Sequence, residues 1–345
     1  MGYSDLPRKK LGFFPTPLAE LDRLSRHLSG PRLFVKRDDL SGLAFGGNKT
    51  RKLEFLIGEA IALGCDTVIT GGAEQSNHCR QTAAAAAVCG LECHLVLGGA
   101  PPAVPNGNLL LDMLCGAKIH WRGDLRKGEA IPEIAKQMKK AGRKPFVIPY
   151  GGSNSIGAIG FVEAVRELCA QTSDAGVSVT HVVFPSSSGG THAGLALGAR
   201  LFKQSFEMVG IGIDKGETGG LSLDRYIVEV ANETAGRIGE SCRFSVGDIT
   251  IRNEYLGGGY GIVGAAEEEA IRLTAEKEGL FLDPVYTGRA MAALIDLIRK
   301  GEFSPDETVL FWHTGGTPAL FPYAHQLAAC CQREMQQTVG TDCRL

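Results

Sequence analysis

The chain has 345 residues, of which 44% are hydrophobic and 21% charged, and its formal net charge is −2. This composition is that of a globular protein large enough for two domains, and the near-neutral charge gives no reason to expect nucleic acid or an anionic membrane as a partner. No apolar run is long enough to predict a membrane-spanning helix, and the polar N-terminal segment lacks the apolar core of a secretion signal. The 10 cysteines include no C-x-x-C pair, which favours reduced thiols and a cytoplasmic location.

Segments with the apolar patterns of strands and helices alternate along the chain. The predicted strands cover 32–36, 66–70, 92–97, 118–121, 145–149, 180–184, 208–213, 248–252 and 308–312, and the predicted helices cover 21–28, 50–63, 76–88, 109–114, 131–141, 161–171, 192–202, 223–238, 265–278 and 289–299. This alternation predicts an α/β fold with largely parallel sheets. Strand after strand runs into a glycine-rich turn, and ligands bind at the carboxyl ends of parallel strands.

The stretch 44–55 places a lysine directly after a tight turn. Two glycines allow the backbone to turn, and Asn48 can cap the helix that follows. Lys49 then lies in the first helical turn, where free N–H groups and the helix dipole lower the pKa of an ammonium group. Schiff-base chemistry requires a lysine with such a pKa. Lys52 is an equal candidate on composition, and either lysine could instead be a solvated surface residue.

The turn 185–191 separates a predicted strand from a predicted helix. Its glycines allow close approach of the backbone, and its hydroxyls and free N–H groups can bind a phosphate. The turn lacks the lysine of a nucleoside-triphosphate loop, and no G-x-G-x-x-G motif follows another strand. A phosphate on a small cofactor therefore fits better than ATP or NAD, although a plain turn with a helix cap remains the simpler alternative.

A second anion-binding turn is predicted at 71–78. Ser76 and Asn77 either cap the next helix or hold a carboxylate, and His78 either joins them or is a polar residue of the first turn. Tyr260 and Tyr286 stand beside glycine turns, where they either face a cleft or are buried against backbone. The lysine, the phosphate turn and the anion turn together indicate pyridoxal phosphate and a small amino-acid substrate, and no metal.

Five motifs in this order resemble the D-cysteine desulfhydrase and 1-aminocyclopropane-1-carboxylate (ACC) deaminase family. They are Gly-Gly-Asn-Lys-Thr-Arg-Lys-Leu-Glu at 46–54, Gln-Ser-Asn-His at 75–78, Ser-Gly-Gly-Thr-His-Ala-Gly at 188–194, Asp-Pro-Val-Tyr-Thr-Gly at 283–288 and His-Thr-Gly-Gly at 313–316. The resemblance runs from about Leu11 to Tyr323. It implies a homodimeric, tryptophan-synthase-β-like (fold type II) enzyme with two domains, each a largely parallel twisted sheet flanked by helices. A small domain, 50–157, would be inserted in a large cofactor-binding domain, 1–49 and 158–345.

Position by position, the resemblance implies a role for each matching residue. Lys49 would be the Schiff-base lysine, which makes Lys52 a residue of the helix face. The turn that binds the substrate carboxylate would consist of Gln75, Ser76, Asn77 and His78, with Asn77 also beside the cofactor's ring oxygen. The phosphate would be held by Ser188, Gly189, Gly190 and Thr191, and the catalytic residues would be Lys49, Ser76, Tyr260 and Tyr286.

Two further positions of the cofactor site separate branches of the family. Thr287 would face the pyridine nitrogen, where ACC deaminases carry a glutamate, and Thr314 stands where they carry a leucine. A glutamate would protonate the ring and strengthen the electron sink, and a hydroxyl does so less. The resemblance is therefore closest to the desulfhydrase branch, which implies αβ-elimination of D-cysteine to pyruvate, ammonia and hydrogen sulfide.

Several departures leave alternatives open. Glu74 stands where an apolar residue is usual, and Lys215 or Arg289 could supply a cation to a sulfonate unless it is solvated. L-cysteate sulfo-lyase, which releases sulfite, is therefore the first alternative. ACC deaminase is a weaker alternative, and a pyridoxal-phosphate-binding protein without turnover is the weakest.

Overall fold

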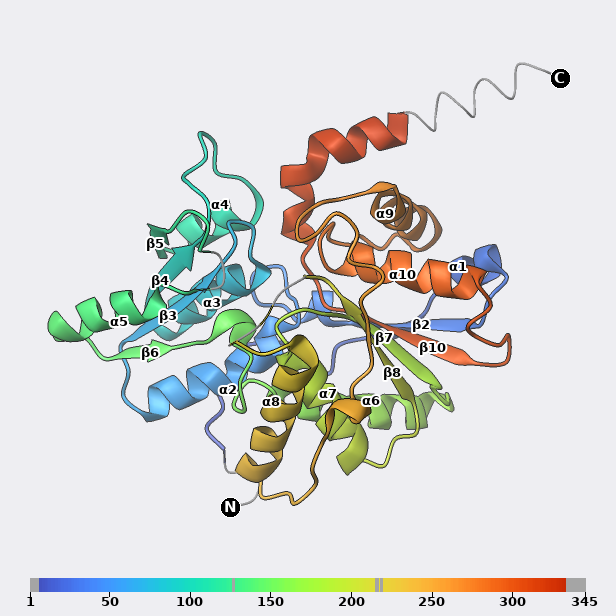
Figure 1. Ribbon diagram of the computed structural model, residues 1–345, viewed down its shortest axis with the longest axis horizontal. Helices are drawn as coiled ribbons and strands as arrows, with labels where there is room; N and C mark the ends of the chain where they lie inside the picture. Colours follow the sequence, from blue (N-terminus) through green and yellow to red (C-terminus); the bar gives the residue numbers. More distant parts are fainter. Residues whose placement is uncertain (1–5, 126–127, 215–216, 218–219, 333–345) are drawn as a thin grey trace.

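The computed structural model describes residues 6–125, 128–214, 217 and 220–332, which form two β-sheets flanked by helices (Figure 1). The larger sheet has the strand order β1-β2-β10-β7-β8-β9, and only β1 runs antiparallel to its neighbour. Its strands are β1 (Leu18–Glu20), β2 (Arg32–Arg37), β7 (His181–Ser186), β8 (Glu207–Gly212), β9 (Ile251–Arg252) and β10 (Thr308–His313). The smaller sheet is parallel throughout, with the order β5-β4-β3-β6, and contains β3 (Thr67–Gly72), β4 (Glu92–Leu97), β5 (Lys118–Trp121) and β6 (Pro145–Val147).

Helices cover both faces of each sheet (Figure 1). Around the larger sheet lie α1 (Asp22–Leu28), α6 (Ile159–Ala175), α7 (Gly190–Leu201), α8 (Leu223–Arg237), α9 (Ala265–Glu278) and α10 (Thr287–Arg299). Around the smaller sheet lie α2 (Lys49–Ala62), α3 (Asn77–Cys89), α4 (Gly107–Leu114) and α5 (Ile131–Lys140). Short 3-10 helices are η2 (Asp38–Leu40), η3 (Tyr150–Gly152), η4 (Val246–Asp248) and η5 (Thr317–Tyr323). Helix α2 packs against both α3 and α6, so it links the helices of the two sheets.

The apolar strands of the larger sheet supply two cores because successive side chains point to opposite faces. In β10, Val309 and Phe311 pack with α1, α9 and α10. Leu310 and Trp312 point the other way and pack with α6 and α7. An unbroken apolar run of this kind is typical of a parallel strand buried on both sides, as predicted.

The prediction of an α/β fold with largely parallel sheets is confirmed, with differences at element ends. The expected strand 248–252 is instead the turn η4 followed by a pair of residues, Ile251 and Arg252, that bond to the edge of β8. Helix α6 is longer than expected and ends only at Gly176, whose φ of 62° closes the helix. The domain bounds 50–157 remain a prediction.

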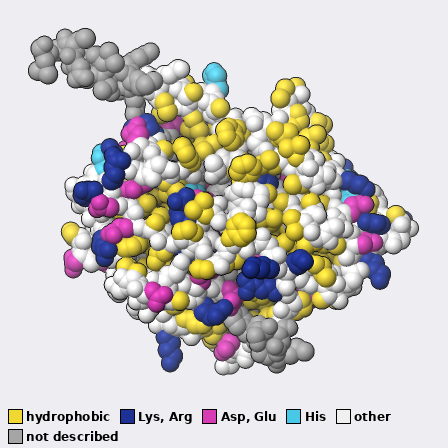
Figure 2. Space-filling model, turned by 180° about the vertical axis from the view of Figure 1, so that it is seen from behind, with side chains coloured by type: hydrophobic (Ala, Val, Ile, Leu, Met, Phe, Trp, Pro, Cys, Tyr) yellow, Lys and Arg dark blue, Asp and Glu magenta, His cyan; other side chains and the backbone are white. Residues whose placement is uncertain are grey.

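Three features of the described residues concern the environment of the protein: the apolarity of its helices, the state of its cysteines and its apolar surface. No helix in the described part of the chain is long and apolar enough to cross a membrane. Nine cysteines lie in that part, and all are free thiols. Hydrophobic side chains form patches on the face shown in Figure 2.

Candidate active site

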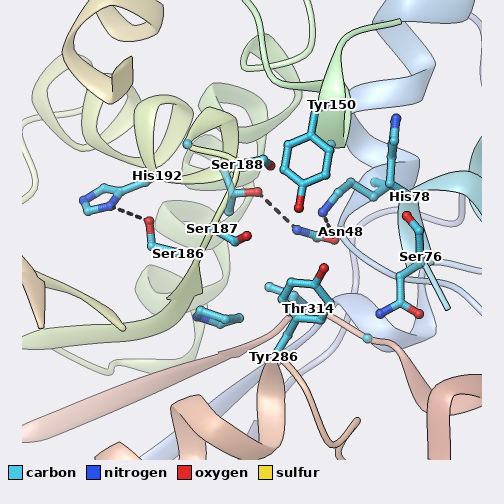
Figure 3. A pocket seen from close by; sticks show the side chains of 17 residues that line it. Asn48, Ser76, His78, Tyr150, Ser186, Ser187, Ser188, His192, Tyr286 and Thr314 are labelled. Atoms are coloured by element: carbon cyan, nitrogen blue, oxygen red, sulfur yellow. Dashed lines mark hydrogen bonds between the residues drawn. The ribbon is translucent and has the colours of Figure 1, made fainter. Parts of the chain in front are cut away.

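The carboxyl ends of β3, β7 and β10 open onto one cavity between the two sheets (Figure 3). The residues that line it are Asn48, Lys49, Ser76, Asn77, His78, Tyr150, Gly151, Pro185, Ser186, Ser187, Ser188, Gly189, Thr191, His192, Tyr286, Thr314 and Gly315. Nine of the predicted site residues are thus brought together: Lys49, Ser76, Asn77, His78, Ser188, Gly189, Thr191, Tyr286 and Thr314. Four others, Gln75, Gly190, Tyr260 and Thr287, are not among the lining residues.

Lys49 is the first residue of α2, as predicted, and its side chain reaches the cavity. The pKa of Lys49 is lowered to about 8, chiefly by burial. The charge of Arg80 lowers this pKa further, and the carboxylate of Asp283 opposes both effects. Burial among protein atoms is therefore the main reason that a larger fraction of Lys49 is unprotonated near neutral pH than of an ordinary lysine.

Asn48 precedes α2 but does not cap it, contrary to the prediction. Its Nδ2 donates to Oγ1 of Thr191 at 3.1 Å, and its Oδ1 accepts from Nζ of Lys49 at 3.1 Å. The amide therefore joins the lysine to the turn after β7, because its donor and its acceptor face different partners.

The turn 75–78 lies at the start of α3, where Ser76 is the N-cap and its Oγ accepts from the backbone N of Cys79 at 3.2 Å. Ser76 and Asn77 both line the cavity, so capping and ligand binding do not exclude each other at Ser76. Gln75 turns away, because its Oε1 accepts from the backbone N of Asn108 and its Nε2 donates to Glu74 and Asn106.

His78 is buried, and its pKa lies well below the ordinary value because of burial and the nearby charges of Lys49 and Lys52. The hydroxyl of Thr70 donates to the backbone oxygen of Ile148 at 2.9 Å and lies 2.8 Å from Nε2 of His78. A hydroxyl has one proton, so Nε2 carries the hydrogen and Nδ1 is an acceptor. His78 is therefore a neutral imidazole and not a cation that pairs with a carboxylate.

The turn after β7 has the form of a phosphate site. Gly189 takes a φ of 83° and precedes α7, whose first residue is Gly190. The Oγ of Ser153 lies 2.8 Å from Oγ of Ser188 and accepts from the N of Gly190 at 3.1 Å. A Cβ on Gly190 would lie 2.8 Å from Cα of Ser153, so only glycine allows this approach. Hydroxyls and a helix N-terminus thus meet at one end of the cavity.

Lys52 was expected only as a residue of the helix face, and the structure gives it buried contacts that the sequence did not predict. The side chain is completely buried, and Nζ donates to the backbone oxygen of Gly151 at 3.1 Å and to Oγ of Ser153 at 3.2 Å. Burial and the charge of Lys49 hold its pKa well below the ordinary value. Residues three apart on a helix share a side, and this spacing from Lys49 was the available signal. An anion beside Ser153 and Ser188 would compensate this buried amine, so the residues fit a phosphate group.

Tyr286 lines the cavity, and its hydroxyl lies 2.8 Å from that of Tyr260. Burial and the neighbouring Tyr260 raise the pKa of Tyr286 well above the ordinary value, so it stays a phenol that can donate a proton.

Thr287 is buried outside the lining, and its hydroxyl donates to Oδ1 of Asp283 at 2.7 Å. Thr314 lies at the end of β10 and lines the cavity.

Arg289 and Lys215 were considered as cations that could bind a sulfonate group. Arg289 is neither solvated nor free to bind a sulfonate, because its guanidinium donates to Glu267 and to the backbone oxygens of Ile213, Gly259 and Ile262. It instead holds the glycine-rich loop that carries Tyr260. Lys215 lies outside the described residues.

Two lining residues, Tyr150 and Gly151, had no predicted role in the site, and Asn48 was predicted only as a helix cap. The other lining residues without an individual role belong to the predicted phosphate turn or to the family motifs: Pro185, Ser186, Ser187, His192 and Gly315. Burial lowers the pKa of His192 to about 3, and its Nδ1 lies 3.2 Å from Oγ of Ser186. Tyr150 comes from the segment after β6, where the sequence shows only a Pro-Tyr-Gly-Gly turn. Its approach to the cavity depends on the packing of the smaller sheet.

Comparisons with known proteins identify the family of the chain. Residues 9–315 match the family model of pyridoxal-phosphate dependent enzymes. A D-cysteine desulfhydrase of Klebsiella pneumoniae is 43% identical over 92% of this chain and 96% of its own length. The crystal structure of an ACC deaminase homologue has a TM-score of 0.86 at 37% identity, covering 95% of this chain and 97% of the other.

A hydrogen sulfide-producing enzyme of Fusobacterium nucleatum shares the fold, with a TM-score of 0.63 at 18% identity, covering 89% of this chain and 97% of the other. The predicted fold type II architecture is confirmed by these similarities. The chain belongs to the family of pyridoxal-phosphate dependent enzymes.

Proposed function

We propose that the protein catalyses αβ-elimination of a β-substituted sulfur amino acid, with D-cysteine as substrate and pyruvate, ammonia and hydrogen sulfide as products. The observation that carries this proposal is Lys49, an amine with a pKa of about 8 that faces a cavity between a carboxylate-binding turn and a phosphate site. The 43% identity to a D-cysteine desulfhydrase supports the choice of substrate.

Pyridoxal 5'-phosphate would be held by Lys49 through its amine, by Asn77 and Thr314 beside the ring, and by the phosphate site at 188–191. Thr287 is included in this set on the family resemblance alone, because its hydroxyl donates to Asp283 and it does not line the cavity. A bound phosphate would favour the protonated form of Lys52, whose ammonium group would then neutralise charge on the phosphate. When bound, the cofactor would draw electrons from the substrate's α-carbon.

The residues of the chain would then act on the substrate itself. Ser76, Asn77 and the backbone N–H of His78 in the first turn of α3, with Gln75 holding the turn, bind the carboxylate and so fix the direction of the Cα–H bond. Lys49 accepts the α-proton, which its lowered pKa allows. The Cβ–S bond breaks as the electron pair from Cα–H moves toward Cβ. Tyr286, with Tyr260 behind it, donates a proton to the departing thiolate, and the released aminoacrylate hydrolyses to pyruvate and ammonia.

The arrangement favours a thiolate over a sulfite leaving group. Arg289, the described cation that could have served a sulfonate, is fully bonded to Glu267 and backbone oxygens. L-cysteate sulfo-lyase activity is therefore the secondary proposal. Thr287 and Thr314, in place of a glutamate and a leucine, argue against opening of the ACC ring.

The decisive experiment compares pyruvate release from D-cysteine, L-cysteine, L-cysteate, D-serine and ACC. We expect D-cysteine to be the best substrate, and Lys49→Ala to lower its turnover by on the order of a thousandfold or more and to abolish the colour of the lysine-bound cofactor. Lys139→Ala, an exposed lysine of α5, is the control. Turnover of ACC alone, or full activity in Lys49→Ala, would refute the proposal.

We further propose that the protein is a cytoplasmic homodimer with the small domain at 50–157. Phe13 and Phe45 expose 75% and 65% of their surface, and Leu40 exposes 48%. The N of Phe13 donates to the oxygen of Ser41, so these apolar side chains come from neighbouring segments that a second copy could cover. The free thiols suit a reducing compartment. Sedimentation equilibrium would test the dimer, and a monomer at micromolar concentration would contradict it.

A further inference from the structure

Arg80 connects two parts of the site without lining the cavity. It lies in α3 two residues after His78, and its side chain is completely buried. Its Nη2 donates to the backbone oxygen of Gly46 at 2.6 Å, and its Nη1 donates to Oδ1 of Asn108 at 3.0 Å. One guanidinium therefore holds the loop that leads to Lys49 and the first turn of α4.

Asn108 extends this connection to the carboxylate-binding turn. Its Nδ2 donates to Oδ1 of Asn77 and to the backbone oxygen of Gln75, both at 2.8 Å. Its backbone N donates to Oε1 of Gln75 at 2.9 Å. The side chain is completely buried, so these bonds do not compete with solvent. Asn108 thus fixes both the side chain of Asn77 and the backbone that precedes Ser76.

The loop that Arg80 holds has an unfavourable backbone conformation. Ala44 and Phe45 have φ values of 44° and 65°, and Gly46 and Gly47 continue with 65° and 125°. The left-handed region is unfavourable for residues with a Cβ, so the surrounding structure must impose it. The bond from Arg80 to the oxygen of Gly46 is one such restraint, three residues before Lys49.

The charge of Arg80 is also felt by Lys49. Burial lowers the pKa of Arg80 to about 10, and the buried carboxyl of Asp112 opposes this shift, so Arg80 remains a cation at neutral pH. The other groups that act on Lys49 or share the cavity with it are Asp283, Lys52, His78, Tyr150, His192 and Tyr286.

We propose that Arg80 and Asn108 form a positioning unit that fixes the carboxylate-binding turn relative to Lys49. The binding of the substrate carboxylate and the position of Lys49 then depend on the same buried contacts. This inference rests on the proposed function, because the unit orients the substrate's α-carbon toward Lys49. If Arg80 and Asn108 had a purely structural role, their substitution would lower the stability of the protein. It would change neither the KM for the substrate nor the pKa of Lys49.

The first test separates KM from cofactor retention in the holoenzyme. Asn108→Ala should raise the KM for D-cysteine about tenfold or more, because the turn loses its bonds, while the dissociation constant of pyridoxal phosphate rises by a smaller factor because Lys49 and the phosphate site still hold the cofactor. Asn232→Ala is the matched control, since Asn232 also bonds through both side-chain atoms, to Phe244 far from the site. It should change neither quantity.

The second test does not depend on turnover. Capture of pyridoxal phosphate by the apoenzyme needs an unprotonated Lys49, so in wild type it should increase with pH around a midpoint near 8. Arg80→Met removes a positive charge, which should move the midpoint to higher pH. Arg80→Lys keeps the charge and loses the two-pronged contact, so it should retain the midpoint and raise the KM.

The outcomes distinguish this inference from the proposed function. Equal KM values in Asn108→Ala and Asn232→Ala, or equal midpoints in wild type and Arg80→Met, would overturn the positioning unit. A shifted midpoint in Arg80→Met together with no pyruvate from D-cysteine in wild type would refute the proposed function and support the unit's effect on Lys49.

Discussion

Two lysines three residues apart on α2 dominate the electrostatics of the site. Lys49 and Lys52 both have lowered pKa values, and burial is the largest cause for each. His78 is neutral beside them. Buried bases without a compensating anion are unfavourable, and the phosphate site at Ser153 and Ser188 lies where an anion would relieve the penalty.

Lys52→Met should therefore raise the stability of the apoenzyme and weaken the binding of pyridoxal phosphate. Because the pKa of Lys52 is lower in the folded than in the unfolded state, the unfolded chain binds the extra proton at neutral pH, which lowers the free energy of unfolding by about 1.4 kcal/mol for each pKa unit of the shift that lies above the pH. Lys52→Met removes this penalty. Urea denaturation at pH 7 should show a more stable apoenzyme, while the dissociation constant of pyridoxal phosphate rises about tenfold or more.

The exposed Lys139 of α5 provides the control, and Lys139→Met should leave both quantities unchanged. A less stable apoenzyme with unchanged cofactor affinity in Lys52→Met would contradict the assignment of Lys52 to the phosphate site.

At the level of elements, the first turn of α7 requires glycine. Gly190 packs against Ser153 of the segment after β6, so the phosphate site is built from a helix of the larger sheet and a turn beside the smaller one. Gly189, with a φ of 83°, orients the free N–H groups of this helix. The phosphate site therefore forms only when α7 and the segment after β6 are in close contact.

Gly190→Ala should weaken cofactor binding by about tenfold or more, because the new Cβ would lie 2.8 Å from Cα of Ser153 and push the two elements apart. Equilibrium titration with pyridoxal phosphate measures this effect. Gly236→Ala in α8 is the control, since nothing lies within 4 Å of its Cβ position. That substitution should leave affinity unchanged and stabilise the protein by up to about 1 kcal/mol. Equal cofactor affinities in the two variants would show that the contact at Gly190 is unimportant.

At the scale of the whole molecule, a buried charge cluster ties α2 to the larger sheet. Arg51 of α2 donates to Asp38 after β2 and to Glu167 of α6, and Lys36 of β2 also pairs with Glu167. The indole of Trp312 in β10 donates to Asp38 at 2.8 Å. The helix that begins with Lys49 is thereby fixed to the sheet whose strand ends form the phosphate site.

This charge cluster makes the free energy of unfolding depend on pH in the acidic range. Burial raises the pKa of Glu167, but its bonds to Arg51 and the charge of Lys36 outweigh that effect and lower the pKa to about 2. A carboxylate with a lowered folded-state pKa contributes stability that is present above its unfolded pKa of about 4.5 and is lost as the pH falls toward 2. The loss should reach about 3 kcal/mol.

Urea denaturation of the apoenzyme at pH 6, 4.5 and 3 would measure this loss against Glu167→Gln, which lacks the titrating group. The variant should be less stable at pH 6, and the difference should shrink as the pH falls. A difference that does not depend on pH would rule out Glu167 as the titrating group.

The sequence determined the α/β class, the lysine at a helix start and the cofactor, because alternating patterns, glycine turns and short motifs are local properties of the chain. It missed Lys52 and the partner of Asn48, and it left open whether Arg289 serves the site. A side chain's partners come from distant segments: Lys52 meets Ser153, and Asn48 meets Thr191. The tertiary structure alone decided which polar groups are buried and what compensates them, because burial and partnership depend on how the two sheets are packed against each other.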